Sequence, residues 1–206
     1  MSPLFKTRPA PRSYGGGMSR EQLIPRAVKT AVEVVGGIEP DRLGAPTPCS
    51  EYDVRALVHH LLFWGPSLEG AARKESVPPP AAAEPDVDLV TGAWAADLTA
   101  QLRRTADAWS APGAWTGTTR MGGPAEMPAE LVGGMVLGEV VVHTWDLAQA
   151  TGQAATWDDD VLDQVHQDLV PTAQMGRDMG VYGPEVPVPA DAPLIHRILG
   201  LTGRRP

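Results

Sequence analysis

One stretch, residues 128–152, restricts the fold more than any other because it predicts a long helix with an acid and an imidazole on its apolar side. At about 100° per residue, Glu139 and His143 lie one turn apart on the same helical face. The rest of that stripe is aliphatic and consists of Val132, Val136, Leu147 and Ala150. An ionised carboxylate is costly to bury among aliphatic side chains unless it is paired or binds a metal ion. The pattern therefore predicts a helix that carries a binding site on its buried face.

A second predicted helix, which includes residues 53–68, supplies another imidazole. Its apolar positions centre near Leu61 on a helical wheel. His60 lies roughly 100° from that centre and His59 roughly 160° from it. We therefore expect His59 to face water and His60 to turn toward a neighbouring helix.

His60, Glu139 and His143 together form a candidate metal site. Zinc suits two imidazoles and one carboxylate with a fourth position left open, although nickel, iron and manganese also accept such ligands. The alternative interpretation is a buried histidine and glutamate that hydrogen-bond to each other without a metal. Asp146, one turn after His143, is either a carboxylate that orients this imidazole or a surface or capping residue.

Size and charge favour one domain that acts on small molecules. The chain has 206 residues and a formal net charge of -8, so it can bury a core alone and lacks the basic surface that nucleic acids require. We expect no apolar run long enough to cross a bilayer, and hence no membrane partner. Three arginines are candidates for anion contacts, and their spacing ranks none above the others: Arg55, Arg120 and Arg177.

The single cysteine, Cys49, excludes an internal disulfide and suits a reducing cytoplasm. It lies before a predicted helix, where it is either a small buried hydrophobe or a thiol activated by the helix dipole. We expect a cytoplasmic protein that is a monomer or a homodimer.

The chain divides into a disordered leader, residues 1–18, and one helical domain, residues 19–206. Ser19 and Gln22 form a capping box that predicts a helix start, and Met18 is an alternative translation start. Helices are expected over residues 21–35, from a Ser50 cap to about 73, and over 86–109, 128–151, 158–175 and 194–201. The proline-rich tract 78–85 predicts a stiff, exposed linker, and residues 115–127 predict at most a short hairpin. Four amphipathic helices without alternating strands indicate an all-α fold, a helix bundle with its site between facing helices.

Two motifs resemble a known family. They are TPCSEYDVRALVHHL at residues 47–61 and GEVVVHTWDLAQATG at residues 138–152, and they are similar to the motifs of DinB-like metal-binding proteins of the mycothiol-dependent maleylpyruvate isomerase type. The segment VPVPADAP at residues 186–193, with the short helix after it, resembles an actinobacterial branch whose members are mostly uncharacterised. The sequence departs from the family at Tyr52, where tryptophan is common, and at Thr144, where glycine is frequent.

This resemblance implies a DinB-like four-helix bundle in which His60, Glu139 and His143 bind a divalent metal, zinc above all, with mycothiol as cosubstrate. The function that it implies is a thiol-dependent metalloenzyme, a transferase or isomerase, in which a metal-bound thiolate attacks a small electrophile. The alternative is a non-catalytic module that binds a metal or senses metal or thiol status.

Overall fold

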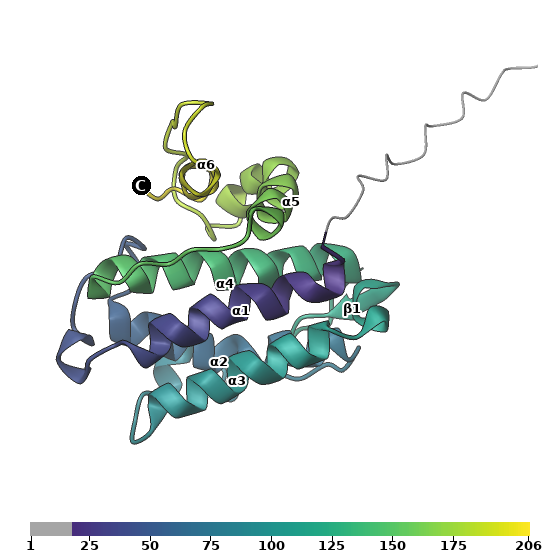
Figure 1. Cartoon of the computed structure of the whole chain (residues 1–206). Helices are drawn as coiled ribbons and strands as arrows, with labels where there is room; N and C mark the ends of the chain where they lie inside the picture. Colours follow the sequence, from purple (N-terminus) through teal and green to yellow (C-terminus); the bar gives the residue numbers. More distant parts are fainter. Residues whose placement is uncertain (1–17) are drawn as a thin grey trace, which may run out of the picture.

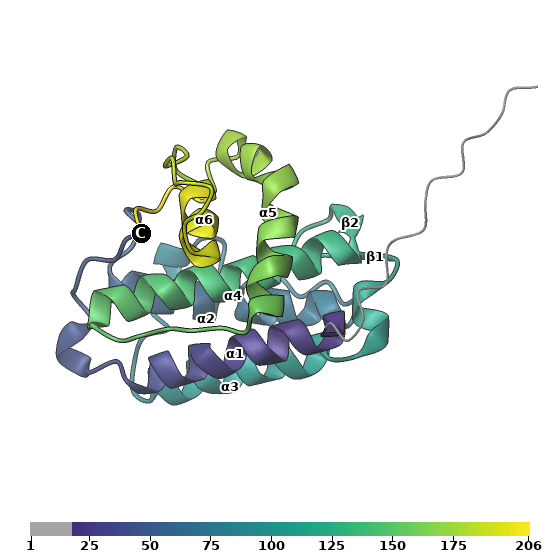
Figure 2. The same cartoon turned by 45° about the horizontal axis from the view of Figure 1, so that its top comes forward.

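The computed structural model describes residues 18–206, and four of its helices form a bundle (Figures 1 and 2). These are α1 (Arg20–Gly36), α2 (Val54–Ala72), α3 (Trp94–Trp109) and α4 (Ala129–Thr151). Each of α1 and α2 packs against both α3 and α4. The all-α, DinB-like bundle expected from the sequence is confirmed. The expected disordered leader lies outside the described residues, apart from Met18.

Two further helices, α5 (Asp159–Asp178) and α6 (Leu194–Leu201), lie outside the bundle, where α5 packs against α4 and α6 packs against α5. Figure 1 shows both of them on the side of α4 that faces away from α2 and α3. Because α4 is thus covered from two sides, apolar residues are found all round it. Among the described residues it is the one helix long and apolar enough to span a membrane, which the sequence analysis did not expect, and most of it is buried inside the protein.

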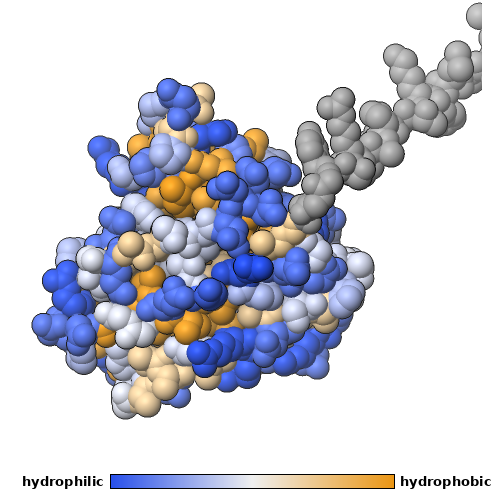
Figure 3. Space-filling model, in the orientation of Figure 1, coloured by the Kyte–Doolittle hydropathy of each residue, from blue (hydrophilic) through white to orange (hydrophobic). Residues whose placement is uncertain are grey.

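The remaining elements are short. A two-stranded antiparallel hairpin, β1 (Thr118–Arg120) and β2 (Glu126–Pro128), precedes α4, as the sequence predicted. Three 3₁₀ turns cover Pro40–Arg42, Glu84–Asp86 and Pro112–Trp115. In the view of Figure 3 most outer side chains are hydrophilic, and apolar ones gather in two places, over the lower half of the bundle and around α6. Leu194, Ile195 and Leu201 of α6 are only partly buried.

Two helix starts differ from those expected. Asp53, not Ser50, caps α2, because its carboxylate Oδ1 accepts a hydrogen bond from the backbone amide of Ala56 at 2.7 Å. α3 begins at Trp94 rather than near Asp86, because the segment before it forms a 3₁₀ turn and then extended chain. The capping box of Ser19 and Gln22 is present at the start of α1.

Close packing fixes α4 in the bundle. A Cβ atom at Gly133 would lie 2.4 Å from the Trp115 ring and 2.9 Å from the Trp109 ring, so only glycine permits this approach. Both tryptophans are buried, and their rings meet edge to face at 5.1 Å between centroids. This contact fixes the first half of α4 and so determines where the following turns, with Glu139 and His143, meet α2.

Candidate metal centre

The three residues predicted to form the site come together between α2 and α4. His60 Nε2 lies 2.9 Å from Glu139 Oε1, and His143 Nε2 lies 3.5 Å from the same oxygen. One nitrogen or oxygen atom from each residue lies within 4.8 Å of the other two. His60 thus lies on the edge of α2 that the helical wheel predicted.

Each imidazole is held at its other nitrogen by a further carboxylate. Asp146 Oδ2 lies 3.0 Å from His143 Nδ1, and Glu84 Oε1 lies 2.9 Å from His60 Nδ1. A carboxylate at Nδ1 accepts a hydrogen bond from an N–H there, so the neutral ring carries its lone pair on Nε2. Both Nε2 atoms face Glu139, which is the arrangement typical of metal-binding histidines.

Asp146 is neither a surface residue nor a helix cap. It is fully buried, and Arg204 donates to it from Nη2 at 2.9 Å to Oδ2 and from Nε at 3.4 Å to Oδ1. A buried carboxylate without a partner would be strongly destabilising, and the guanidinium compensates its charge. Asp146 is thus held between Arg204 and His143.

Glu84 was missed by the sequence analysis. The tract 78–85 is mostly exposed, as predicted, but its partly buried Glu84 places a carboxylate oxygen 2.9 Å from His60 Nδ1. Trp64 Nε1 donates to Glu84 Oε1 at 2.9 Å, and the Tyr52 hydroxyl lies 3.1 Å from His60 Nδ1. No periodic signal marks Glu84, because its partners lie on another element.

His59 does not face water as predicted. Its Nε2 atom lies 2.7 Å from the carbonyl oxygen of Val87, and its ring stacks on Phe63 at 6.0 Å between centroids. It is partly buried beneath the chain that leads to α3. His59 therefore lies outside the site, as predicted, but it packs against other residues instead of facing water.

The carboxylates beside His60 favour positive charge at this ring, and the imidazoles keep Glu139 ionised. Burial by itself lowers the pKa of His60, but hydrogen bonds to Glu139 and Glu84 and their charges raise it to about 9. Burial alone would raise the pKa of Glu139, but the charges of His143 and His60 lower it to about 2. Two imidazoles and a carboxylate are a ligand set that zinc and similar ions accept. The residues present therefore fit a divalent metal.

A second group, Cys49, His143 and Asp146, also has ligand atoms within 4.8 Å of one another. The Arg204 guanidinium already forms an ion pair with the Asp146 carboxylate, and its positive charge disfavours a metal ion at this second group. Burial raises the pKa of the Cys49 thiol, and the nearby Arg204 offsets this only in part. Of the two interpretations of Cys49, an unreactive thiol is therefore favoured. Cys49, Arg204 and Tyr182 line a recess of about 140 Å³ beside His143.

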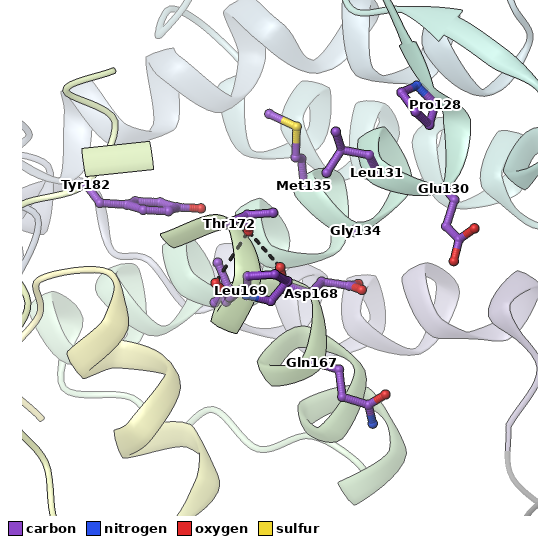
Figure 4. A pocket seen from close by; sticks show the side chains of 11 residues that line it. Pro128, Glu130, Leu131, Gly134, Met135, Gln167, Asp168, Leu169, Thr172 and Tyr182 are labelled. Carbon is purple, nitrogen blue, oxygen red and sulfur yellow. Dashed lines mark hydrogen bonds between the residues drawn. The ribbon is translucent and has the colours of Figure 1, made fainter. Parts of the chain in front are cut away.

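A separate groove of about 280 Å³ lies between α4 and α5 (Figure 4). Leu131, Met135 and Leu169 form apolar parts of its lining, and Glu130 and Asp168 contribute carboxylates. No described residue that lines it is basic, so it suits neutral or cationic compounds better than anions. Tyr182 lines both this groove and the recess beside His143.

Fold and site define the class of protein: a DinB-like helical bundle in which two helices present a histidine, glutamate and histidine group. A sequence-family model described as "Mycothiol maleylpyruvate isomerase N-terminal domain" matches residues 25–148. This match covers more than half of the chain and contains His60, Glu139 and His143. The chain belongs to this family.

Individual proteins and solved structures are also similar to this chain. Two uncharacterized proteins of Mycobacterium tuberculosis, from the strains CDC 1551 / Oshkosh and ATCC 25618 / H37Rv, are each 33% identical over 134 residues, which is 65% of this chain and 68% of theirs. Crystal structures of the mycothiol-dependent maleylpyruvate isomerase and of a mutant with one histidine replaced by alanine superpose with TM-scores of 0.55 and 0.58. Each covers 76% of this chain and 71% of its own, at 16% and 15% identity respectively, and shows that the fold is shared.

Proposed function

We propose that His60, Glu139 and His143 hold a divalent metal ion, preferably zinc, and that the protein uses mycothiol or a similar small thiol on a small electrophile. The reaction is either the transfer of the thiol to the electrophile or the thiol-assisted isomerisation of the electrophile. One observation supports the proposal above all others: both imidazoles are held by carboxylates at Nδ1 and turn Nε2 toward the same Glu139 oxygen.

A divalent ion bound here would supply Lewis acidity and keep a thiol deprotonated near neutral pH, so that no dedicated base is needed. The protein's own part is to orient the ligands. Once a ring is neutral, as metal binding requires, Glu84 or Asp146 would keep its remaining proton on Nδ1 and leave Nε2 free for the ion. The His143 side chain is 10% exposed and the Glu139 side chain 27%, so a thiol has access from the Glu139 side.

Tyr52 is the hydrogen-bonding residue at the edge of the site. Burial and the charge of Glu84 raise the pKa of Tyr52 to about 12, so its phenol stays protonated at neutral pH. Because the Nδ1–H group of His60 points at Glu84 and at the Tyr52 oxygen, the phenol proton is free to donate. It is available to a thiol or electrophile at this edge.

Elemental analysis of the purified protein tests metal binding. We expect about one divalent ion per chain, and none in the triple variant His60→Ala, Glu139→Ala, His143→Ala. His59→Ala is the matched control, because it removes the neighbouring imidazole on α2 without touching the site. If the wild-type protein contains no metal after incubation with zinc, the proposal is wrong.

Thiol use is tested separately. Calorimetry should show that the zinc-loaded protein binds mycothiol and the triple variant does not. Incubation with mycothiol and a panel of small electrophiles should then yield conjugates or isomers. A rate that His143→Ala leaves unchanged would contradict the catalytic assignment, and metal and thiol binding without turnover would favour the non-catalytic module.

A further inference from the structure

We propose that Arg204 is a positioning residue of the metal centre: it holds Asp146 and thereby fixes the ring orientation and tautomer of His143. This inference rests on the proposed function, since it concerns how one ligand of the ion is held. It adds a residue from the turn after α6, outside the four-helix bundle, to the determinants of metal affinity.

The contacts form one continuous chain from Arg204 to the site. The guanidinium reaches both carboxylate oxygens of Asp146, at 2.9 Å and 3.4 Å. The oxygen at the shorter distance, Oδ2, also lies 3.0 Å from His143 Nδ1. His143 Nε2 in turn faces Glu139. A displacement of the guanidinium therefore reaches the ligand atom through one shared oxygen.

Burial makes this arrangement rigid. Asp146 is fully buried and Arg204 is 5% exposed, so water does not compete for the hydrogen bonds between them. The other terminal nitrogen of Arg204, Nη1, donates to the Thr202 carbonyl oxygen at 2.9 Å. Hydrogen bonds to Asp146 and to the Thr202 carbonyl hold the guanidinium in one orientation. A lysine ammonium could not form the same set of hydrogen bonds.

The backbone after α6 aims Arg204 at this point. Gly203 has a positive φ of 82°, a conformation that favours glycine. The Arg204 amide then donates back to the Leu199 carbonyl oxygen at 2.9 Å and closes the end of α6. A Cβ atom at Gly203 would also lie 2.8 Å from the Gly183 backbone. The turn therefore requires glycine at the position before Arg204.

The two imidazoles differ in how firmly they are held. Glu84, the partner of His60, comes from a loop, and its side chain is 23% exposed. Asp146, the partner of His143, lies on the same helix as the ring and is locked by Arg204. His143 is therefore the fixed ligand, and the Arg204 contact is the reason.

A double-mutant cycle tests the proposal, with zinc affinity from chelator competition as its readout. The variants are Arg204→Met, Asp146→Asn and the two combined. Each single change should weaken zinc binding about 10- to 100-fold. The combined variant should bind no more weakly than Asp146→Asn alone, because Arg204 acts through Asp146. Arg204→Lys should restore only part of the loss, and Arg205→Met, which removes an exposed neighbouring charge, should change nothing.

A second readout does not depend on zinc. Nitrogen-15 NMR of the His143 ring, recorded at a pH where the ring is neutral, should show the proton on Nδ1 in the wild type and a mixture of tautomers in Arg204→Met. If Arg204→Met does not fold, the same measurements are made on Arg204→Lys and on the combined variant. The combined variant leaves no uncompensated buried charge.

The outcomes separate this proposal from the metal assignment. Two results would overturn the positioning role alone, provided that the wild type binds zinc. One is an unchanged zinc affinity and His143 tautomer in the Arg204 variants. The other is a loss of affinity in the combined variant that equals the sum of the two single losses in free energy. A lower melting temperature without any change in zinc affinity would show that Arg204 is only structural. Absence of zinc binding in the wild type would overturn both proposals.

Discussion

Metal binding at pH 7 should release about one proton from His60. In the metal-free protein this ring lies between two carboxylates, with 2.9 Å from Nε2 to Glu139 and 2.9 Å from Nδ1 to Glu84. Burial opposes protonation, but the two acids raise the pKa to about 9. At two pH units below that value, protonated rings outnumber neutral ones by about a hundred to one. A metal needs the neutral ring, so this proton must leave.

Calorimetric titration with zinc in two buffers of different ionisation enthalpy measures this release. The difference between the observed enthalpies gives the number of protons per ion. Glu139, with a pKa of about 2, is ionised throughout and contributes none. We expect about one proton from His60 at pH 7 and about half a proton near pH 9, where the ring is already half neutral.

The variant Glu84→Gln isolates the contribution of His60. It keeps the shape of the side chain but removes one of the two charges that raise the pKa, so fewer protons should be released at pH 8 than in the wild type. Glu75→Gln, in an exposed part of the same connection between α2 and α3, is the matched control. Release close to zero at pH 7, or equal release from Glu84→Gln and the wild type, would refute the electrostatic argument.

Three further predictions concern stability and ligand identity. Because the pKa of His60 is raised from 6.5 to about 9, its contribution to the stability of the metal-free protein is complete below pH 6.5 and is lost as pH rises through 9, which melting curves with chelator should show. Gly133→Ala should cost about 1–3 kcal/mol in urea unfolding, because the new Cβ would clash with the Trp115 ring. Gly138→Ala should be neutral or stabilise by up to about 1 kcal/mol, because beyond the local helix backbone its Cβ would meet nothing within 4 Å. Cys49→Ala should retain the bound ion, and its loss in elemental analysis would identify Cys49 as a ligand.

Local periodicity was sufficient to predict which residues of the candidate site share one face of α4. Glu139 and His143 are four residues apart, so their shared face follows from helical geometry alone. His60 required one more step, because its direction depends on which side of α2 the core occupies. The apolar residues around Leu61 fixed that side, and the structure has His60 where the wheel indicated.

The residues that hold the imidazoles could not be predicted in the same way. Glu84 lies in a proline-rich tract whose composition indicates an exposed linker, and Arg204 lies in a turn of the last few residues. Both reach the site through tertiary contacts that no sequence spacing encodes. The three arginines that the sequence offers as candidates for anion contacts each form an ion pair with an acidic side chain elsewhere: Arg55 with Asp88, Arg120 with Glu126 and Arg177 with Glu185.

Asp146 shows why the interpretation of one residue depended on the fold as a whole. On an isolated α4 it would be a polar residue one turn after a histidine, with no indication of burial. The packing of α5 and α6 outside the bundle changes this, because it buries Asp146 and brings Arg204 to it. A buried aspartate needs a positive partner, and Asp146 Oδ2 lies 2.9 Å from Arg204 Nη2 and 3.0 Å from His143 Nδ1. The helices outside the bundle therefore determine the electrostatics of the site inside it, and changes in α6 should alter metal affinity without altering any ligand.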